Sequence, residues 1–247
     1  MMNKHYVHSA FQILKLRARI LNLNSQYLRR ELYPERNILY NLDNRLAVLL
    51  KSLDKYDFIK RISSGSALFV GEGNFSFVYT LAKMQRQLGN IIASTYEKYT
   101  ALSDFSKHNL KLLEKIGVHV LQDVDATKLH KTFNEGSFDT IIFQFPHTGN
   151  RESVNNLNPN YVLVRDFIIS AYRILKMHGI ILITVVDNDY YNNIFKFGEI
   201  AELCGLSTPI KYVFDPDDYP GYIHTMAHRE GSAIDEYDQF ATWEFQV

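Results

Sequence analysis

The sequence predicts an α/β fold over residues 66–247, built on a doubly wound parallel sheet whose strands alternate with helices. Two observations support this expectation. Short apolar runs typical of buried strands alternate with longer amphipathic segments typical of helices. The first apolar run, residues 67–70, is followed directly by Gly71, Glu72 and Gly73 and then by a helix-like segment. A strand, a glycine turn and a helix in this order are typical of folds that bind a ligand at the turn.

The alternation continues to the end of the chain. We expect strands at residues 67–70, 90–96, 118–121, 138–145, 180–186, 210–214 and 240–245. We expect helices from about residue 75 and over residues 102–116, 127–133, 161–177 and 191–204. Glycines that commonly end helices follow four of the helical segments, at Gly89, Gly117, Gly179 and Gly205.

Residues 1–65 are expected to form a basic helical N-terminal extension that precedes this domain. Apolar residues recur at roughly helical spacing on both sides of Pro34, which predicts two helices. We expect residues 54–65 to form a linker. Residues 1–66 contain 12 Lys and Arg against 5 Asp and Glu, whereas the rest contains 15 against 22. Such a basic segment suits a polyanionic partner, a protein partner, or simply a solvated helix face.

Composition narrows the class of protein. With 46% apolar residues the chain can bury a sizeable core, so we expect a globular protein. No apolar run is long enough for a membrane helix, and residues 1–10 lack the apolar core of a secretory signal. The single cysteine, Cys204, excludes an internal disulfide and a cysteine-rich metal site, and it fits a reducing, cytosolic-type compartment. We expect no metal.

Ligands of such sheets bind beyond the carboxyl ends of the strands, so residues directly after strands are the candidates for a site. The turn residues Gly71, Glu72 and Gly73 follow the first strand, and Asn74 or Ser76 is a candidate helix cap. The carboxylate Glu72 disfavours a phosphate and suits a cationic ligand. Each residue also has an ordinary structural explanation, such as a tight turn without a ligand.

Three further strand ends carry polar residues. Glu97 follows the second strand and can accept hydrogen bonds from ribose hydroxyls, although it also suits the start of a helix. Asp125 follows the third strand and can accept from an adenine amino group or cap a helix, with Ala126 beside it. The segment 144–147 follows the fourth strand. Together these residues predict a nucleoside-bearing cofactor laid across the strand ends.

The same residues carry a family resemblance. Residues 68–77 resemble the "LLVGEGDFSF" opening of the 25S rRNA (uridine-N3)-methyltransferase-like family, and residues 93–97, 123–129 and 138–147 resemble its next motifs. Residues 219–224 and 241–245 resemble its closing segments. Gln144 stands where the family usually has Asn, and Asn74 replaces a usual Asp. The resemblance covers about residues 66–247.

The resemblance implies a Rossmann-like class I methyltransferase that uses S-adenosylmethionine and methylates uridine N3 in rRNA. Its implied cofactor-binding residues are Gly71, Glu72, Gly73, Asn74, Phe75, Ser76, Glu97, Asp125, Ala126 and Gln144. The residues that we expect to be catalytic are Gln144, Pro146 and His147, with His147 as a base for the N3 proton. Those expected to bind the substrate base are Phe145, Tyr222 and His224.

Other functions remain open at this point. A methyltransferase acting on a small molecule or a protein fits the unusual Gln144. A binding or effector module that retains the fold without turnover, with residues 1–65 engaging a protein partner, fits the unmatched N-terminal segment. In the leading interpretation RNA is the partner, held in the pocket and by the basic N-terminal helices. The protein would then be cytoplasmic, or nucleolar if it is a eukaryotic rRNA enzyme.

Overall fold

The computed structural model describes residues 55–85, 89–150, 152, 157–225 and 232–246. The residues from Tyr56 onward form one compact unit. The helices expected within residues 6–50 lie outside the described residues. None of the helices in the described ranges is long and apolar enough to cross a bilayer.

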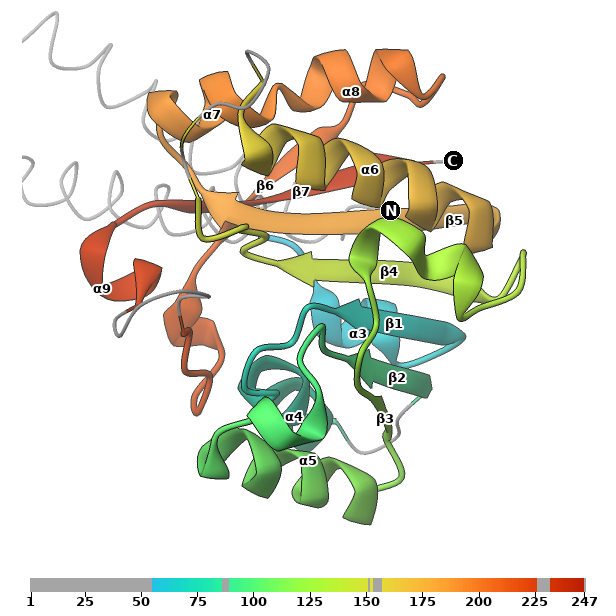
Figure 1. Ribbon diagram of the computed structural model, residues 1–247, viewed down its shortest axis with the longest axis vertical. Helices are drawn as coiled ribbons and strands as arrows, with labels where there is room; N and C mark the ends of the chain where they lie inside the picture. Colours follow the sequence, from blue (N-terminus) through green and yellow to red (C-terminus); the bar gives the residue numbers. More distant parts are fainter. Residues whose placement is uncertain (1–54, 86–88, 151, 153–156, 226–231, 247) are drawn as a thin grey trace, which may run out of the picture. The chain divides into compact units, whose positions relative to one another are not determined.

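Strands and helices alternate as expected (Figure 1). The strands are β1 (Ser66–Val70), β2 (Asn90–Ser94), β3 (His119–Leu121), β4 (Phe138–Gln144), β5 (Leu175–Val186), β6 (Ile210–Phe214) and β7 (Phe240–Gln246). The α-helices are α3 (Phe58–Ile62), α4 (Ser76–Lys83), α5 (Asp104–Lys115), α6 (Pro159–Ile174), α7 (Asp189–Phe195), α8 (Phe197–Leu203) and α9 (Ala233–Glu236). Short 3₁₀ turns are η1 (Tyr99–Ala101), η2 (Ala126–Lys131) and η3 (Pro216–Asp218), and η2 replaces the short helix expected at residues 127–133.

The strands form one seven-stranded sheet in the order β3-β2-β1-β4-β5-β7-β6. Figure 1 shows β5, β4, β1, β2 and β3 side by side. This is the expected doubly wound, Rossmann-like α/β sheet, and its strand order reverses between β1 and β4. The sheet is parallel except at one strand, because β7 runs antiparallel to both β5 and β6. β7 follows β6 along the chain and returns beside it, so these two strands pair antiparallel, and β5 runs in the same direction as β6.

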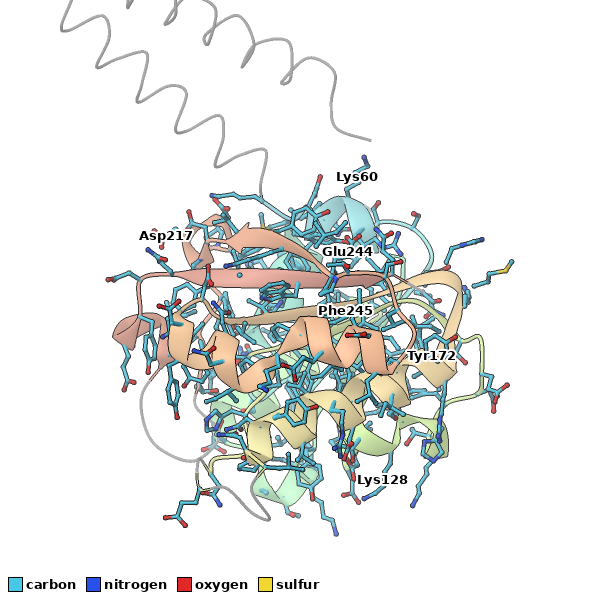
Figure 2. All side chains as sticks on the ribbon, turned by 90° about the horizontal axis from the view of Figure 1, so that it is seen from above. Lys60, Lys128, Tyr172, Asp217, Glu244 and Phe245 are labelled. Atoms are coloured by element: carbon cyan, nitrogen blue, oxygen red, sulfur yellow. The ribbon has the colours of Figure 1, made fainter. Side chains whose placement is uncertain are left out.

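Helices cover both faces of the sheet. On one face α6 packs against β4 through Phe143 and Phe167, and α8 packs against β7 through Phe197 and Phe245. Figures 1 and 2 show α6 and α8 together on this side, with Phe245 facing α8. On the other face, aromatic side chains of α3, α4 and β6 contact one another edge to face, through Phe58, Phe77 and Phe214. Burial of these large rings supplies much of the stabilising apolar contact.

The compact unit begins ten residues before the boundary expected at residues 65 and 66. The segment expected to be a linker contains α3, whose Phe58 and Ile62 are each only 1% exposed. Asp57 caps this helix by accepting a hydrogen bond from the Lys60 N–H at 2.9 Å. Two large apolar side chains one turn apart therefore draw this segment into the core.

The helix expected over residues 191–204 is divided into α7 and α8 at Lys196, which has a left-handed backbone (φ +47°). The break has a packing reason. Phe195 and Phe197 are both buried, and their rings stack with centroids 5.3 Å apart. Residues two apart in a continuous helix point in nearly opposite directions, so both rings reach the same core only if the helix is interrupted.

A polar cluster closes the edge of the sheet opposite the carboxyl ends of the parallel strands. Asp139 accepts hydrogen bonds from the Ser66 N–H at 2.7 Å and the Lys176 Nζ at 2.7 Å. Desolvation raises the pKa of the Asp139 carboxyl, but the hydrogen bonds from Lys176 and Ser66 outweigh it and lower the pKa to about 2. The cluster thereby joins the beginnings of β1, β4 and β5.

We expect Asp139→Asn to lower the free energy of unfolding by about 1 kcal/mol at neutral pH. This figure is discounted because the carboxylate is 37% exposed and solvent screens it. A lowered pKa stabilises above the unfolded value of about 4, and this contribution is lost as pH falls toward 2. Urea unfolding at several pH values should show the two proteins converging in acid. A constant difference between them would contradict the assignment.

Candidate functional site

A cavity of about 910 Å³ opens at the carboxyl ends of β1, β2 and β4, where the strand order reverses. Its size is in the range of small-molecule sites. Of the sequence-predicted residues, those that line it are Gly71, Glu72, Gly73, Asn74, Glu97, Asp125, Ala126, Gln144, Phe145, Pro146, His147, Tyr222 and His224. The structure therefore brings together residues from four strand ends and from the segment after β6.

Two predicted residues, Phe75 and Ser76, do not line the cavity. Phe75 has a left-handed backbone (φ +62°) and a fully buried side chain, so it belongs to the core. Ser76 begins α4 and exchanges two hydrogen bonds with Ile223, because its Oγ donates to the Ile223 carbonyl and accepts from the Ile223 N–H, both at 2.9 Å. Asn74 Nδ2 donates to the same carbonyl at 2.7 Å. These residues hold the cavity wall in place.

Buried polar side chains of α5 support the glycine turn. Ser106 Oγ donates to the Gly73 carbonyl at 3.2 Å, and Asn109 Nδ2 donates to the Asn74 carbonyl at 2.9 Å. Both side chains are at most 5% exposed. Sequence reasoning missed these two residues. The available signal was a polar residue at two inward positions of an amphipathic helix, where apolar residues are the norm.

The carboxyl of Glu72 lies in the turn and is only 5% exposed. Burial raises the pKa of Glu72 to about 8, and a long contact from the Val78 N–H at 3.5 Å lowers it only in part. A buried carboxylate without a cationic partner is costly, so a cation that enters the cavity gains a strong electrostatic partner.

Glu97 and Asp125 stand at the ends of β2 and β3. Glu97 lines the cavity with an exposed side chain, which leaves it accessible to a ligand. Asp125 is engaged already. Its Oδ1 accepts from the N–H and Oγ1 of Thr127, and its Oδ2 forms an ion pair with Lys128 at 2.8 Å. Asp125 is thus the cap of η2, and its proposed contact with an adenine amino group stays a prediction.

Gln144 ends β4 with a buried amide. Neither Nε2 nor Oε1 has a hydrogen-bond partner among the described residues, and both atoms are buried. An unpaired buried amide costs about 1–3 kcal/mol for each group, so it is rarely retained without use. Its position in the cavity lining makes a ligand the natural partner of this amide.

The two histidines of the cavity are both held at Nδ1. His147 Nδ1 accepts from the Gly149 N–H at 2.8 Å, and His224 Nδ1 accepts from the Ala233 N–H at 3.0 Å. A neutral ring with this contact carries its proton on Nε2. To accept a proton at Nε2, the neutral ring of His147 would need its own proton on Nδ1. That tautomer would break the hydrogen bond from Gly149. Its role as a base stays a prediction.

Aromatic side chains form part of the cavity lining. The Phe145 ring contacts the His224 ring with centroids 4.6 Å apart, and Tyr222 contacts Phe77 at 5.0 Å. Tyr191 and Tyr237, whose rings lie 6.0 Å apart, also line the cavity. The predicted substrate residues Phe145, Tyr222 and His224 therefore all line this cavity, and two of them, Phe145 and His224, are in contact.

The cavity fits S-adenosylmethionine, by its own residues. The absent side chain of Gly73 leaves room on the wall, since a Cβ built there has only the Thr225 Oγ1 within 4 Å, at 3.4 Å. The buried Glu72 suits a cationic amine, and Glu97 suits ribose hydroxyls. No group of three potential metal-binding side chains occurs in the described part of the chain. The residues thus match a cationic nucleoside.

A family model described as rRNA (uridine-N3-)-methyltransferase BTM5-like matches residues 68–226. Heavy metal-associated isoprenylated plant protein 41 of Arabidopsis thaliana is 33% identical over 178 residues, which cover 68% of this chain and 34% of that protein. This chain therefore spans about a third of that relative. Uncharacterized protein At4g26485 of Arabidopsis thaliana is 30% identical over 185 residues, which cover 71% of this chain and 88% of that protein.

Solved structures are similar at lower identity. A SAM dependent methyltransferase from Aquifex aeolicus is 17% identical with a TM-score of 0.43, and the match covers 74% of this chain and 82% of that one. TrmN from Thermus thermophilus is 12% identical with a TM-score of 0.48, and the match covers 76% of this chain and 46% of that one.

Two glycines of the turn should respond differently to alanine. Gly71 has φ +67°, and a Cβ there would fall on the Phe143 ring, so Gly71→Ala should unfold or strongly destabilise the protein. A Cβ at Gly73 meets only an ordinary contact, so Gly73→Ala should keep the melting temperature but place a methyl group in the cavity beside the turn. We expect its affinity for S-adenosylmethionine, measured by calorimetry, to fall at least about tenfold. Equal effects of the two variants on stability would contradict this assignment.

The raised pKa of Glu72 predicts a pH-dependent stability. Ionisation of Glu72 is easier in the unfolded chain than in the folded protein. The contribution of the protonated Glu72 side chain to the free energy of unfolding is therefore fully present below about pH 4 and is lost as pH rises through about 8. Without added ligand, Glu72→Gln should therefore melt several degrees higher than the wild type at about pH 9, and nearly with it at about pH 4. Scanning calorimetry checks this. A melting difference that does not change with pH would exclude Glu72 as the cause.

Proposed function

The chain belongs to the rRNA (uridine-N3-)-methyltransferase BTM5-like family, and from this premise we propose that it methylates N3 of a uridine in RNA, with rRNA as the target. One observation of the site supports this most directly: a single cavity contains both the buried Glu72 carboxyl and the unpaired Gln144 amide. The first suits a cationic cofactor, and the second suits the hydrogen-bonding edge of a base.

The cofactor that we propose is S-adenosylmethionine, which supplies an electrophilic methyl group. Glu72 would face its charged part, Gly73 would allow close approach of the backbone, and Glu97 would accept from ribose hydroxyls. Ser106 and Asn109 keep the glycine turn in the conformation that this contact needs. Preorganisation of this kind lowers the entropic cost of binding.

The substrate base would enter from the aromatic side of the cavity. N3 lies in the paired edge of uracil, so the uridine must be unpaired or flipped out of a helix. Phe145 and Pro146 offer an apolar surface for the base, and Tyr222 lines the same cavity. Positioning of N3 against the methyl donor supplies a large part of the rate enhancement.

Incubation of full-length protein with S-adenosylmethionine and rRNA, followed by mass spectrometry of the nucleosides, tests the proposal. We expect 3-methyluridine as the new product. Another methylated nucleoside would redirect the proposal to a different base. Methylation of protein or of free nucleosides, with none on RNA, would favour a different substrate class, and absence of cofactor binding in calorimetry would contradict a methyltransferase function.

Replacement of Gln144 by an apolar residue should lower activity without lowering stability. Gln144→Leu removes two unpaired buried polar atoms, so the melting temperature should rise or stay unchanged. Its turnover should fall about 10²-fold or more, because the leucine cannot bond to the base. Gln144→Asn, the residue usual in this family, is the matched control and should retain part of the activity. A Leu variant with normal turnover would remove Gln144 from the reaction.

A further inference from the structure

The ring of His224 has a fixed orientation. On one side its Nδ1 accepts from the Ala233 N–H of α9 at 3.0 Å, and Ser232 Oγ lies 3.3 Å from the same nitrogen. The ring contacts Phe145 edge to face, and the residue lines the cavity. A main-chain N–H can only donate, so Nδ1 must be the acceptor.

The other ring nitrogen, Nε2, therefore carries the proton. Burial lowers the pKa of His224 to about 4, which the nearby Asp235 of α9 opposes only in part, so the ring is neutral at physiological pH. In the described part of the chain, no hydrogen bond engages Nε2. His224 thus offers one N–H donor, and Nε2 cannot become an acceptor while the Ala233 N–H of α9 donates to Nδ1.

Gln144 offers a different kind of contact in the same cavity. Its amide has both a donor and an acceptor, and neither has a partner in the described ranges. Rotation by half a turn exchanges the two, so the amide adapts to uracil and cytosine alike. Phe145 follows Gln144 directly and contacts the His224 ring, and all three residues line the same cavity.

We propose that His224 Nε2–H is the group that selects uracil, by donating to the O4 carbonyl of the base while the Gln144 amide donates to the other carbonyl, O2, and leaves the in-plane side of N3 open to the methyl group. This inference rests on the proposed function and names how its substrate is chosen. Uracil presents a carbonyl at position 4, whereas cytosine presents an amino donor there. Two donors that face each other leave both unpaired, so cytosine is rejected.

The same contact favours the reaction. Loss of the N3 proton leaves negative charge on O4, and a fixed donor at O4 stabilises that charge. The N3 proton passes to solvent water, the N3–carbon bond forms as the sulfur–methyl bond breaks, and the sulfonium becomes a neutral thioether. His224 remains neutral throughout, so it acts on the base as a hydrogen-bond donor and takes up no proton.

Two substitutions separate the donor from the structural contact. In His224→Asn the side-chain oxygen can replace Nδ1 and keep the bond to Ala233, but no donor reaches the cavity. In His224→Gln the amide nitrogen lies near the former Nε2 and can restore the donor. Titration of the full chain with uridine 5′-monophosphate and cytidine 5′-monophosphate measures the preference without turnover. Melting temperatures confirm that each variant is folded.

We expect the wild type to bind the uridine nucleotide at least about tenfold more tightly than the cytidine nucleotide. His224→Asn should lose this preference, and His224→Gln should recover part of it. Equal binding of the two nucleotides by the wild type, absence of binding included, or an unchanged preference in His224→Asn overturns the proposal.

Two further readouts distinguish this inference from the proposed function. Nitrogen-15 NMR of labelled histidine should show His224 as the neutral Nε2–H tautomer at about pH 7, and an Nδ1–H or doubly protonated ring overturns the inference. Because the contact with O4 stabilises the deprotonated base, turnover should reach half its maximum at a lower pH in the wild type than in His224→Asn. If 3-methyluridine forms but this pH is the same in the two proteins, the inference fails and the function stands. A uridine preference without methylation of any RNA supports the inference and contradicts the function.

Discussion

The cavity depends on three hydrogen bonds that tie Ile223 to the beginning of α4. Asn74 and Ser76 supply them, and both residues stand immediately after the glycine turn. They fix a segment almost 150 residues away in the chain, so that Tyr222 and His224 face the turn. The serine that begins α4 and the asparagine two residues before it therefore also assemble the two halves of the site.

Several polar groups of this site have lost their contacts with water on folding and have gained no equivalent partner in the protein. Within the ranges that the structure describes, Glu72 is buried without a cationic partner and the Gln144 amide is unpaired. Such groups lower stability, and the extensive aromatic packing around Phe58 and Phe77 offsets the loss. A ligand that satisfies these groups should also stabilise the fold, since it binds only the native state.

The sequence predicts most of the strands and the residues that the strand ends bring to the site. Alternating apolar runs located every strand, and Gly71, Glu97 and Gln144 could be placed at one edge because parallel strands share their carboxyl ends. The direction of β7, the break at Lys196 and the contact between Ser76 and Ile223 could not be placed in this way. They depend on packing between distant segments, which local periodicity does not encode. The tautomer of His224 likewise depends on where Ala233 lies in space.

The insertion of β7 between β5 and β6 has a consequence for biosynthesis. During translation β5 and β6 emerge from the ribosome before the strand that must join them. Until β7 is made, each exposes a row of unpaired backbone groups, which is a template for aggregation. The nascent chain can therefore complete its sheet only after Phe240–Gln246 has been released, and a shortened product that lacks this strand would be a natural client for chaperones and proteases.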